Sequence, residues 1–163
     1  MSANRSNIAW HLENQLLGQD SRAIGMIYEK IVDVSSAELL ALSTTPKELV
    51  EAPGADKVVE LLSAVFFVDY NSAAYATYGD LTINLHTTGT AISNTLDLAD
   101  LLAKTADTYV RLPVADDEET VLQDNEALEL RVATGNPVTG DSPIKVALQY
   151  RIHDFGGENP RFS

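Results

Sequence analysis

A long segment near the end of the chain, Pro143–Asp154, alternates between apolar and polar residues with a period of two. Because side chains of an extended strand point to opposite sides in turn, this pattern predicts a strand with one buried and one solvated face. The positions that we expect to face the core are Ile144, Val146, Leu148, Tyr150 and Ile152. A second alternating run, Glu126–Thr134, precedes it, and the turn-rich segment Gly135–Asp141 joins the two. We therefore expect an antiparallel hairpin that closes an all-β domain.

Other parts of the chain have the composition of short strands. Turn residues separate segments rich in aliphatic, β-branched or aromatic side chains, at 23–34, 47–52, 57–70, 80–86 and 108–114. Two places favour short helices: Ser35 and Glu38 have the spacing of a capping box, and residues 95–104 place leucines at helical spacing. This organisation predicts an antiparallel β-sandwich, jelly-roll-like, with one or two short helices.

The segment Lys57–Tyr70 is the longest apolar run, and it is apolar at odd and at even positions. One apolar face is enough for a strand that lines a two-layer sandwich. We therefore expect the second face to meet a helix, a loop or another subunit. The apolar residues of this second face are Val59, Leu61, Val65 and Phe67.

The formal net charge of −13 limits the kinds of partner. Residues 1–24 are neutral as a whole, so all the excess negative charge belongs to residue 25 onward. Such a surface repels phosphate backbones, and we expect no nucleic-acid partner. It also repels copies of itself, so neighbouring copies need a cationic or strongly apolar contact surface. No apolar run reaches the ~18 residues of a membrane span, and we expect no membrane partner.

The N-terminal segment differs from the rest of the chain. Residues 1–24 are polar, with few strand-forming side chains, and they include the only tryptophan. Ile8, Leu12 and Leu16 stand four residues apart, which favours a short amphipathic helix, and Trp10 lies among them. The segment is either a disordered tail or an extended arm that docks these side chains into a partner. We thus divide the chain into an arm (1–24), a β-sandwich body (25–155) and a C-terminal tail (156–163).

The acidic residues do not predict a catalytic or metal site. Asp116–Glu119 is a run of four consecutive acids, but calcium loops alternate their oxygen ligands and include a glycine. Four loop aspartates could in principle converge as an acid/base pair for glycoside hydrolysis: Asp69, Asp80, Asp124 and Asp141. Aspartates in glycine-containing turns, such as Asp80 and Asp141, more commonly cap the backbone.

The histidines, serines and tyrosines do not predict a catalytic site either. The histidines His11, His86 and His153 lack a second ligand at metal-binding spacing, and the chain has no cysteine. A serine nucleophile elbow and a phosphate-binding glycine loop are both missing. Tyr70, Tyr75 and Tyr78 cluster in the sequence; they either pack into the core and loops or form a rim that binds sugars or a protein. We expect no enzyme activity, no metal and no cofactor.

Three segments, taken in order, resemble a known family. They are 49–59 (LVEAPGADKVV), 62–75 with LSAVFFVDY followed by AAY, and 130–152, where LRVATGNP runs into VALQYRI. This order resembles small structural proteins of tailed bacteriophages, particularly capsid decoration (cement) proteins. The resemblance covers about residues 31–154 and leaves out residues 1–22.

The resemblance implies a non-enzymatic virion protein on the capsid surface, assembled in the host cytoplasm. Such a protein binds the major capsid protein, commonly as a homotrimer with a jelly-roll or related body. It also implies an N-terminal arm that grips the shell. The apolar second face of Lys57–Tyr70 suits the oligomer interface, and the N-terminal segment suits the arm, with Ile8, Trp10, Leu12 and Leu16 as its contact residues. A receptor- or glycan-binding module of a head or tail fibre is the alternative, with Tyr75, Tyr78 and Asn84 as its binding residues. A carbohydrate-active enzyme built on the loop aspartates is the third.

Overall fold

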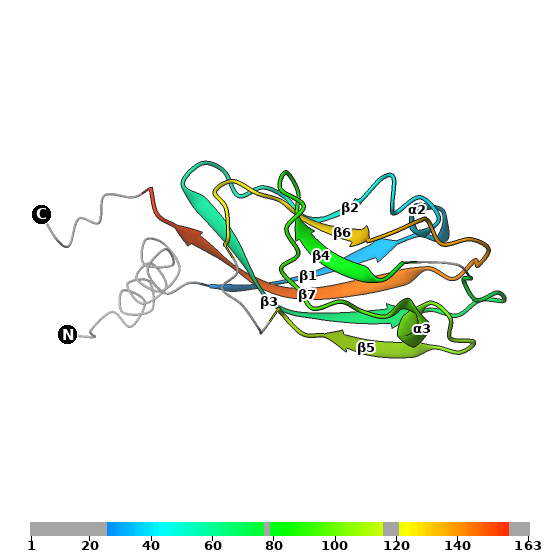
Figure 1. The fold of residues 1–163 in the computed structure, drawn as a ribbon. Helices are drawn as coiled ribbons and strands as arrows, with labels where there is room; N and C mark the ends of the chain where they lie inside the picture. Colours follow the sequence, from blue (N-terminus) through cyan, green and yellow to red (C-terminus); the bar gives the residue numbers. More distant parts are fainter. Residues whose placement is uncertain (1–25, 77–78, 116–120, 157–163) are drawn as a thin grey trace, which may run out of the picture.

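The computed structural model describes residues 26–76, 79–115 and 121–156 as two antiparallel β-sheets packed face to face (Figure 1). The larger sheet has the order β1-β7-β3-β5 and the smaller one β2-β6-β4. The strands are β1 (Ile27–Val34), β2 (Lys47–Val50), β3 (Lys57–Val68), β4 (Leu81–Leu85), β5 (Thr108–Leu112), β6 (Leu128–Val132) and β7 (Ile144–Asp154). The helices are α2 (Ser36–Leu39) and α3 (Leu98–Leu101). The predicted all-β sandwich with short helices is therefore confirmed.

The strand order is jelly-roll-like. Residues 90–96 run along β4 as an irregular further strand of the small sheet, with bridges from Leu81 to Leu96 and from Asn84 to Ala91. The backbone of Leu81 both donates to and accepts from Leu96, at 2.8–2.9 Å. With this segment, each sheet draws its strands from distant parts of the chain, as in a double-sheet jelly roll.

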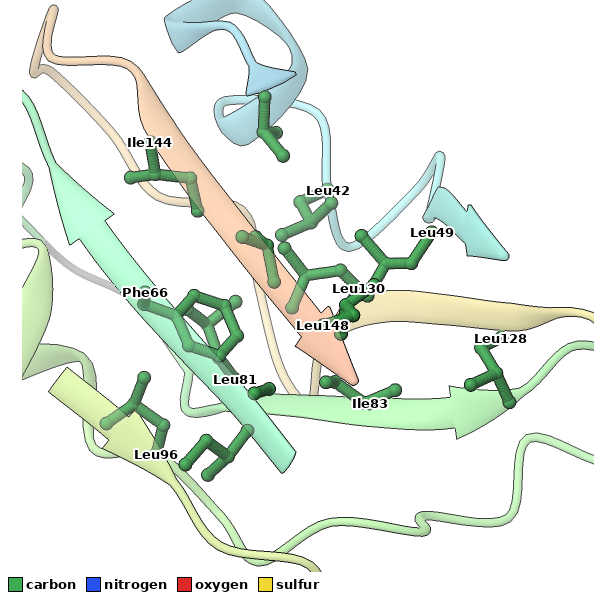
Figure 2. Packing of buried hydrophobic residues seen from close by; sticks show 14 of the residues in the cluster. Leu42, Leu49, Phe66, Leu81, Ile83, Leu96, Leu128, Leu130, Ile144 and Leu148 are labelled. Carbon is green, nitrogen blue, oxygen red and sulfur yellow. The ribbon is translucent and has the colours of Figure 1, made fainter. Parts of the chain in front are cut away.

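The core lies between the two sheets. Phe66 of β3 and Ile144 and Leu148 of β7 point toward the leucines and Ile83 of the small sheet (Figure 2). The predicted inward face of β7 is confirmed, since Ile144, Val146 and Leu148 are at most 1% exposed and the last two positions of the set are half-buried. The predicted capping box is confirmed, since Ser35 and Glu38 bond each other at the start of α2.

A β-bulge in β3 corrects the prediction for its second face. Leu61 pairs with Tyr150 of β7 and Ser63 with the preceding Gln149, so Leu62 is an extra residue. Such an insertion exchanges the two faces of a strand. Before the bulge the odd positions face the core, and Val59 and Leu61 are only 1% and 3% exposed. The prediction that these two belong to an oligomer interface is therefore wrong.

After the bulge the odd positions face outward. Val65 is 38% exposed and Phe67 is half-buried on the outer side of the sheet, so these two members of the predicted set do lie on an outer face. The apolar residues at both odd and even positions of β3 thus reflect a change of face within one strand.

The predicted hairpin between Glu126–Thr134 and Pro143–Asp154 is also wrong. Both segments form strands, but β6 lies between β2 and β4, while β7 lies between β1 and β3 in the other sheet. The connection crosses from one sheet to the other and has positive φ angles at Gly135, Thr139 and Gly140. Alternation shows that a strand has one buried face, but it does not show which sheet the strand joins.

Several predictions concern residues outside the described ranges. These are the arm residues Ile8, Trp10, Leu12 and Leu16, together with His11, Tyr78 and the acidic run 116–119. The predicted arm and tail boundaries at residues 24 and 156 stay predictions for the same reason. The two described helices are single turns of four residues, and none of the described helices approaches the length and hydrophobicity of a membrane span.

Candidate assembly surface

The outer face of the large sheet crosses four strands in register. Residues that alternate with the buried Val34, Val146 and Phe66 point away from the core. Strand pairing aligns them in two adjacent rows, Asp33–Lys145–Phe67–Tyr109 and Ile31–Ala147–Val65–Arg111. We call these two rows the outer patch.

The outer patch is mostly apolar, and Lys145 is the one charged residue on its two central strands. Ile31 is 69% exposed, Val65 38% and Tyr109 72%. The rings of Phe67 and Tyr109 stack with centroids 4.5 Å apart, which extends the apolar surface to the β5 edge of the sheet. Single exposed apolar residues are ordinary, but a contiguous set that spans four strands is a candidate contact surface.

The outer face is electrically neutral in a strongly acidic chain. It carries three acidic residues, Glu29, Asp33 and Glu60, and three basic residues, Arg111, Lys145 and Arg151. The whole chain has a formal charge of −13, so all of that excess lies outside this face. This face can therefore approach an acidic surface, including that of another copy, with little repulsion from its own charges.

Next to the outer patch, the same face becomes polar. Gln149 of β7 donates to Glu29 of β1 at 2.7 Å and accepts from Ser63 of β3 at 3.3 Å. Four residues further along β7, His153 bonds Glu60 at 2.7 Å. The Nε atom of Arg151 is buried between these groups without a hydrogen-bond partner. The outer face therefore has an apolar half and a hydrogen-bonded polar half.

The outer face of the small sheet is different in kind. Glu129 is 6% exposed and receives bonds from Arg131 at 2.9 and 3.2 Å and from His86 Nδ1. Glu126 is 7% exposed and accepts from the Thr87 backbone N–H at 2.7 Å. Both carboxylates thereby hold the turn that follows β4. Within residues 26–76, 79–115 and 121–156, no cluster of three or more acidic or histidine side chains has the geometry of a metal site.

The loop aspartates have structural roles or lie far apart. Asp141 accepts hydrogen bonds from Ser72 Oγ at 2.5 Å, from Ala73 N–H at 2.9 Å and from Ser72 N–H at 3.1 Å. These bonds, with that of the Ser72 hydroxyl first, hold the pKa of Asp141 below its usual value. Asp141 therefore caps backbone N–H groups as predicted, but these belong to a loop 68–69 residues away in the sequence and not to its own turn.

Asp69 and Asp124 cannot act as a pair. Asp69 follows the last residue of β3, whereas Asp124 is adjacent to Asn125, whose N–H bonds the carbonyl of Lys57 at the first residue of β3. A strand rises by about 3.3 Å per residue, so the two carboxylates are separated by roughly 30 Å or more. An acid/base pair for glycoside hydrolysis needs less than about 10 Å.

Two of the residues named for glycan binding are buried. Tyr75 is 3% exposed, its hydroxyl donates to the Ser142 carbonyl at 2.8 Å, and burial, with a smaller contribution from the Asp141 charge, raises its pKa to about 12. Asn84 is 7% exposed and donates to the Gly89 carbonyl at 2.7 Å. The interpretation of Tyr75 as a core residue is therefore confirmed, and the glycan-binding alternative loses both residues.

Sequence reasoning found Val65 and Phe67 but missed Ile31, Tyr109 and Arg111. Each of these stands at an outward position of its strand, next to neighbours that point inward. The alternation around Ile31 could have placed it outside, since Val32 and Val34 are the inward residues of β1. No sequence signal shows that β1 and β5 lie in the same sheet as β3.

Comparisons with known proteins give a fold likeness and no family. No protein-family model matches the chain, and no curated protein matches it. Among solved structures, a chain of the cyanophage Pam1 capsid asymmetric unit is similar, with 16% sequence identity and a TM-score of 0.44. The match covers 78% of this chain and 86% of that chain. At this identity and this TM-score, the likeness assigns neither a family nor a function.

Proposed function

We propose that this protein is a non-enzymatic structural component of a phage virion that binds the outside of the assembled capsid and stabilises it. The single observation that carries the proposal is the apolar, charge-neutral outer face of the large sheet in a chain of charge −13. A monomer that works alone in solution has no use for such a face, whereas a subunit of an assembly needs one. The resemblance of residues 31–154 to decoration proteins supplies the kind of assembly.

Stabilisation by such a protein follows from mass action. A subunit that binds the mature lattice, but not free coat protein, stabilises the shell by about RT ln(1 + [L]/Kd) for each site. When several copies are joined, their N-terminal arms bind neighbouring sites of the lattice, and their high effective concentration makes weak contacts sufficient. We place Ile8, Trp10, Leu12 and Leu16 in the arm contact and Val65 and Phe67 in the contact between copies.

The test uses purified heads of the phage that encodes the chain. We expect the full chain to sediment with mature heads and not with dissociated coat protein, at a fixed ratio to the coat subunit. The double variant Trp10→Ala/Leu16→Ala should stay folded and should bind heads at least tenfold more weakly than the wild type. The variant Thr88→Ala with Thr105→Ala, at exposed positions outside both contacts, is the control. Absence of the protein from mature heads would refute the proposal.

A further inference from the structure

The two edge strands of the outer face carry charges of opposite sign, while Lys145, Arg151 and Glu60 lie on the two central strands. The outward carboxylates Glu29 and Asp33 lie on β1 at one edge, while Arg111 lies on β5 at the other. Asp33 is a solvated acid, with its side chain 79% exposed, and its ion pair to Lys145 at 3.5 Å is correspondingly weak. Arg111 is exposed and has no ion-pair partner among the described residues. One edge of the face is thus acidic and the other is basic.

An apolar strip connects these two edges. Ile31 of β1 and Tyr109 of β5 are its most exposed members, and Val65 and Phe67 lie between them. A second surface that covers this strip must be apolar in the middle and must present a cation opposite β1 and an anion opposite β5. The face itself meets this requirement when a second copy is turned so that its β5 edge lies on β1.

We propose that copies of this chain associate through the outer patch, with the Asp33 edge of one copy against the Arg111 edge of the next. Ile31, Val65, Phe67 and Tyr109 form the apolar part of the contact. The alternative orientation would place β1 on β1, where Asp33 and Glu29 would meet identical carboxylates. The segregated charges therefore favour one orientation and disfavour the other.

This inference deepens the proposed function, because it names the surface through which copies meet, but its test needs no capsid. The association state of the full chain is measured by sedimentation equilibrium, with circular dichroism to confirm that each variant is folded. We expect the wild type to be a dimer at micromolar concentration, because a patch that pairs with the same patch of a second copy closes as a two-fold contact. Asp33→Lys and Arg111→Glu should each weaken association at least tenfold, because each places like charges at the contact.

The double variant with both reversals is decisive. It restores opposite charges across the contact and has the same net charge as the wild type, so its association should return to within about threefold of the wild-type value. Glu48→Lys and Lys104→Glu are matched controls, since they change the net charge equally at sites outside the outer face. Tyr109→Ala tests the apolar part of the contact without charge and should also weaken association at least tenfold.

The outcomes separate this inference from the proposed function. A monomeric wild type, single variants that behave like their controls, or a double variant that stays weak would each overturn the inference. A dimer in which the charge exchange restores association supports the contact and contradicts the predicted homotrimer. The protein could also fail to bind phage heads while its charge variants change self-association as expected. That result would refute the capsid role and support the contact between copies.

Discussion

At the scale of single residues, Gly140 has no room for a side chain. A Cβ atom there would lie 2.5 Å from the ring of Tyr75, and the φ angle of +90° is one that L-residues rarely adopt. We expect Gly140→Ala to lower the free energy of unfolding by about 3 kcal/mol in a denaturant titration. Gly54→Ala is the control, because φ is +98° there with no neighbour within 4 Å, and it should cost about 1 kcal/mol. Equal losses for the two variants would contradict the steric explanation.

Glu38 contributes a pH-dependent part of the stability. Its carboxylate bonds Lys47 Nζ at 2.5 Å and the Ser35 backbone N–H at 2.8 Å, and these bonds lower its pKa from 4.5 to about 2. A carboxylate whose pKa is lower in the folded state stabilises that state above the unfolded pKa. This contribution is lost as the pH falls from about 4.5 toward about 2.

The variant Glu38→Gln tests this contribution. The Glu38 side chain is 42% exposed, so solvent screens the interaction and we expect a loss of about 1 kcal/mol at pH 7. The difference from the wild type should shrink as the pH falls below 4.5, where the wild-type carboxylate begins to lose its advantage. Glu48→Gln, at an exposed position of the adjacent β2, should change little. If the loss of stability in Glu38→Gln did not vary with pH, the effect would come from the packing of the side chain and not from its charge.

At the scale of elements, the bulge at Leu62 determines which residues of β3 are available to a partner. It turns Val59 and Leu61 into core residues and leaves Val65 and Phe67 outside. Sequence alternation predicted the strands and the inward face of β7, because period-two patterning is a local property. It failed in β3, because the extra residue is defined by its pairing with β7 and not by the composition of β3.

Deletion of Leu62 should therefore be far more harmful than its truncation. Without the extra residue, one half of β3 must present its apolar side to water, so several buried side chains leave the core at about 1.5–3 kcal/mol each. We expect the deletion variant to lose its cooperative thermal unfolding transition. Leu62→Ala keeps the bulge and should fold with a loss of at most about 2 kcal/mol, because Leu62 is only half-buried. A deletion variant as stable as Leu62→Ala would show that β3 can shift its register.

At the scale of the whole molecule, a charge of −13 opposes the proposed association, while the neutral outer face permits it. The long-range repulsion between copies is screened by salt, because the Debye length falls from about 10 Å at 0.1 M to about 3 Å at 1 M. The apolar contact across Ile31, Val65 and Tyr109 is not weakened in this way.

Self-association of the wild type should therefore become stronger with salt. We expect the association constant from sedimentation equilibrium to rise several-fold between about 0.05 and 0.5 M NaCl. In Tyr109→Ala the constant should stay low throughout, since salt does not restore lost apolar area. Association that weakens steadily with salt would indicate that ion pairs dominate the contact over apolar burial.

The sequence by itself determined the approximate positions of the named strands and short helices, the inward face of β7 and the capping box at Ser35, because each depends on residues close in the chain or on a two-residue period. Only the tertiary structure decided that β6 and β7 belong to different sheets, that β3 changes its face at Leu62, and that Ile31 and Tyr109 complete one apolar patch. These features depend on which strands pair and in which register. Pairing depends on segments far apart in the chain, and the alternation within one strand does not show which strands lie beside it.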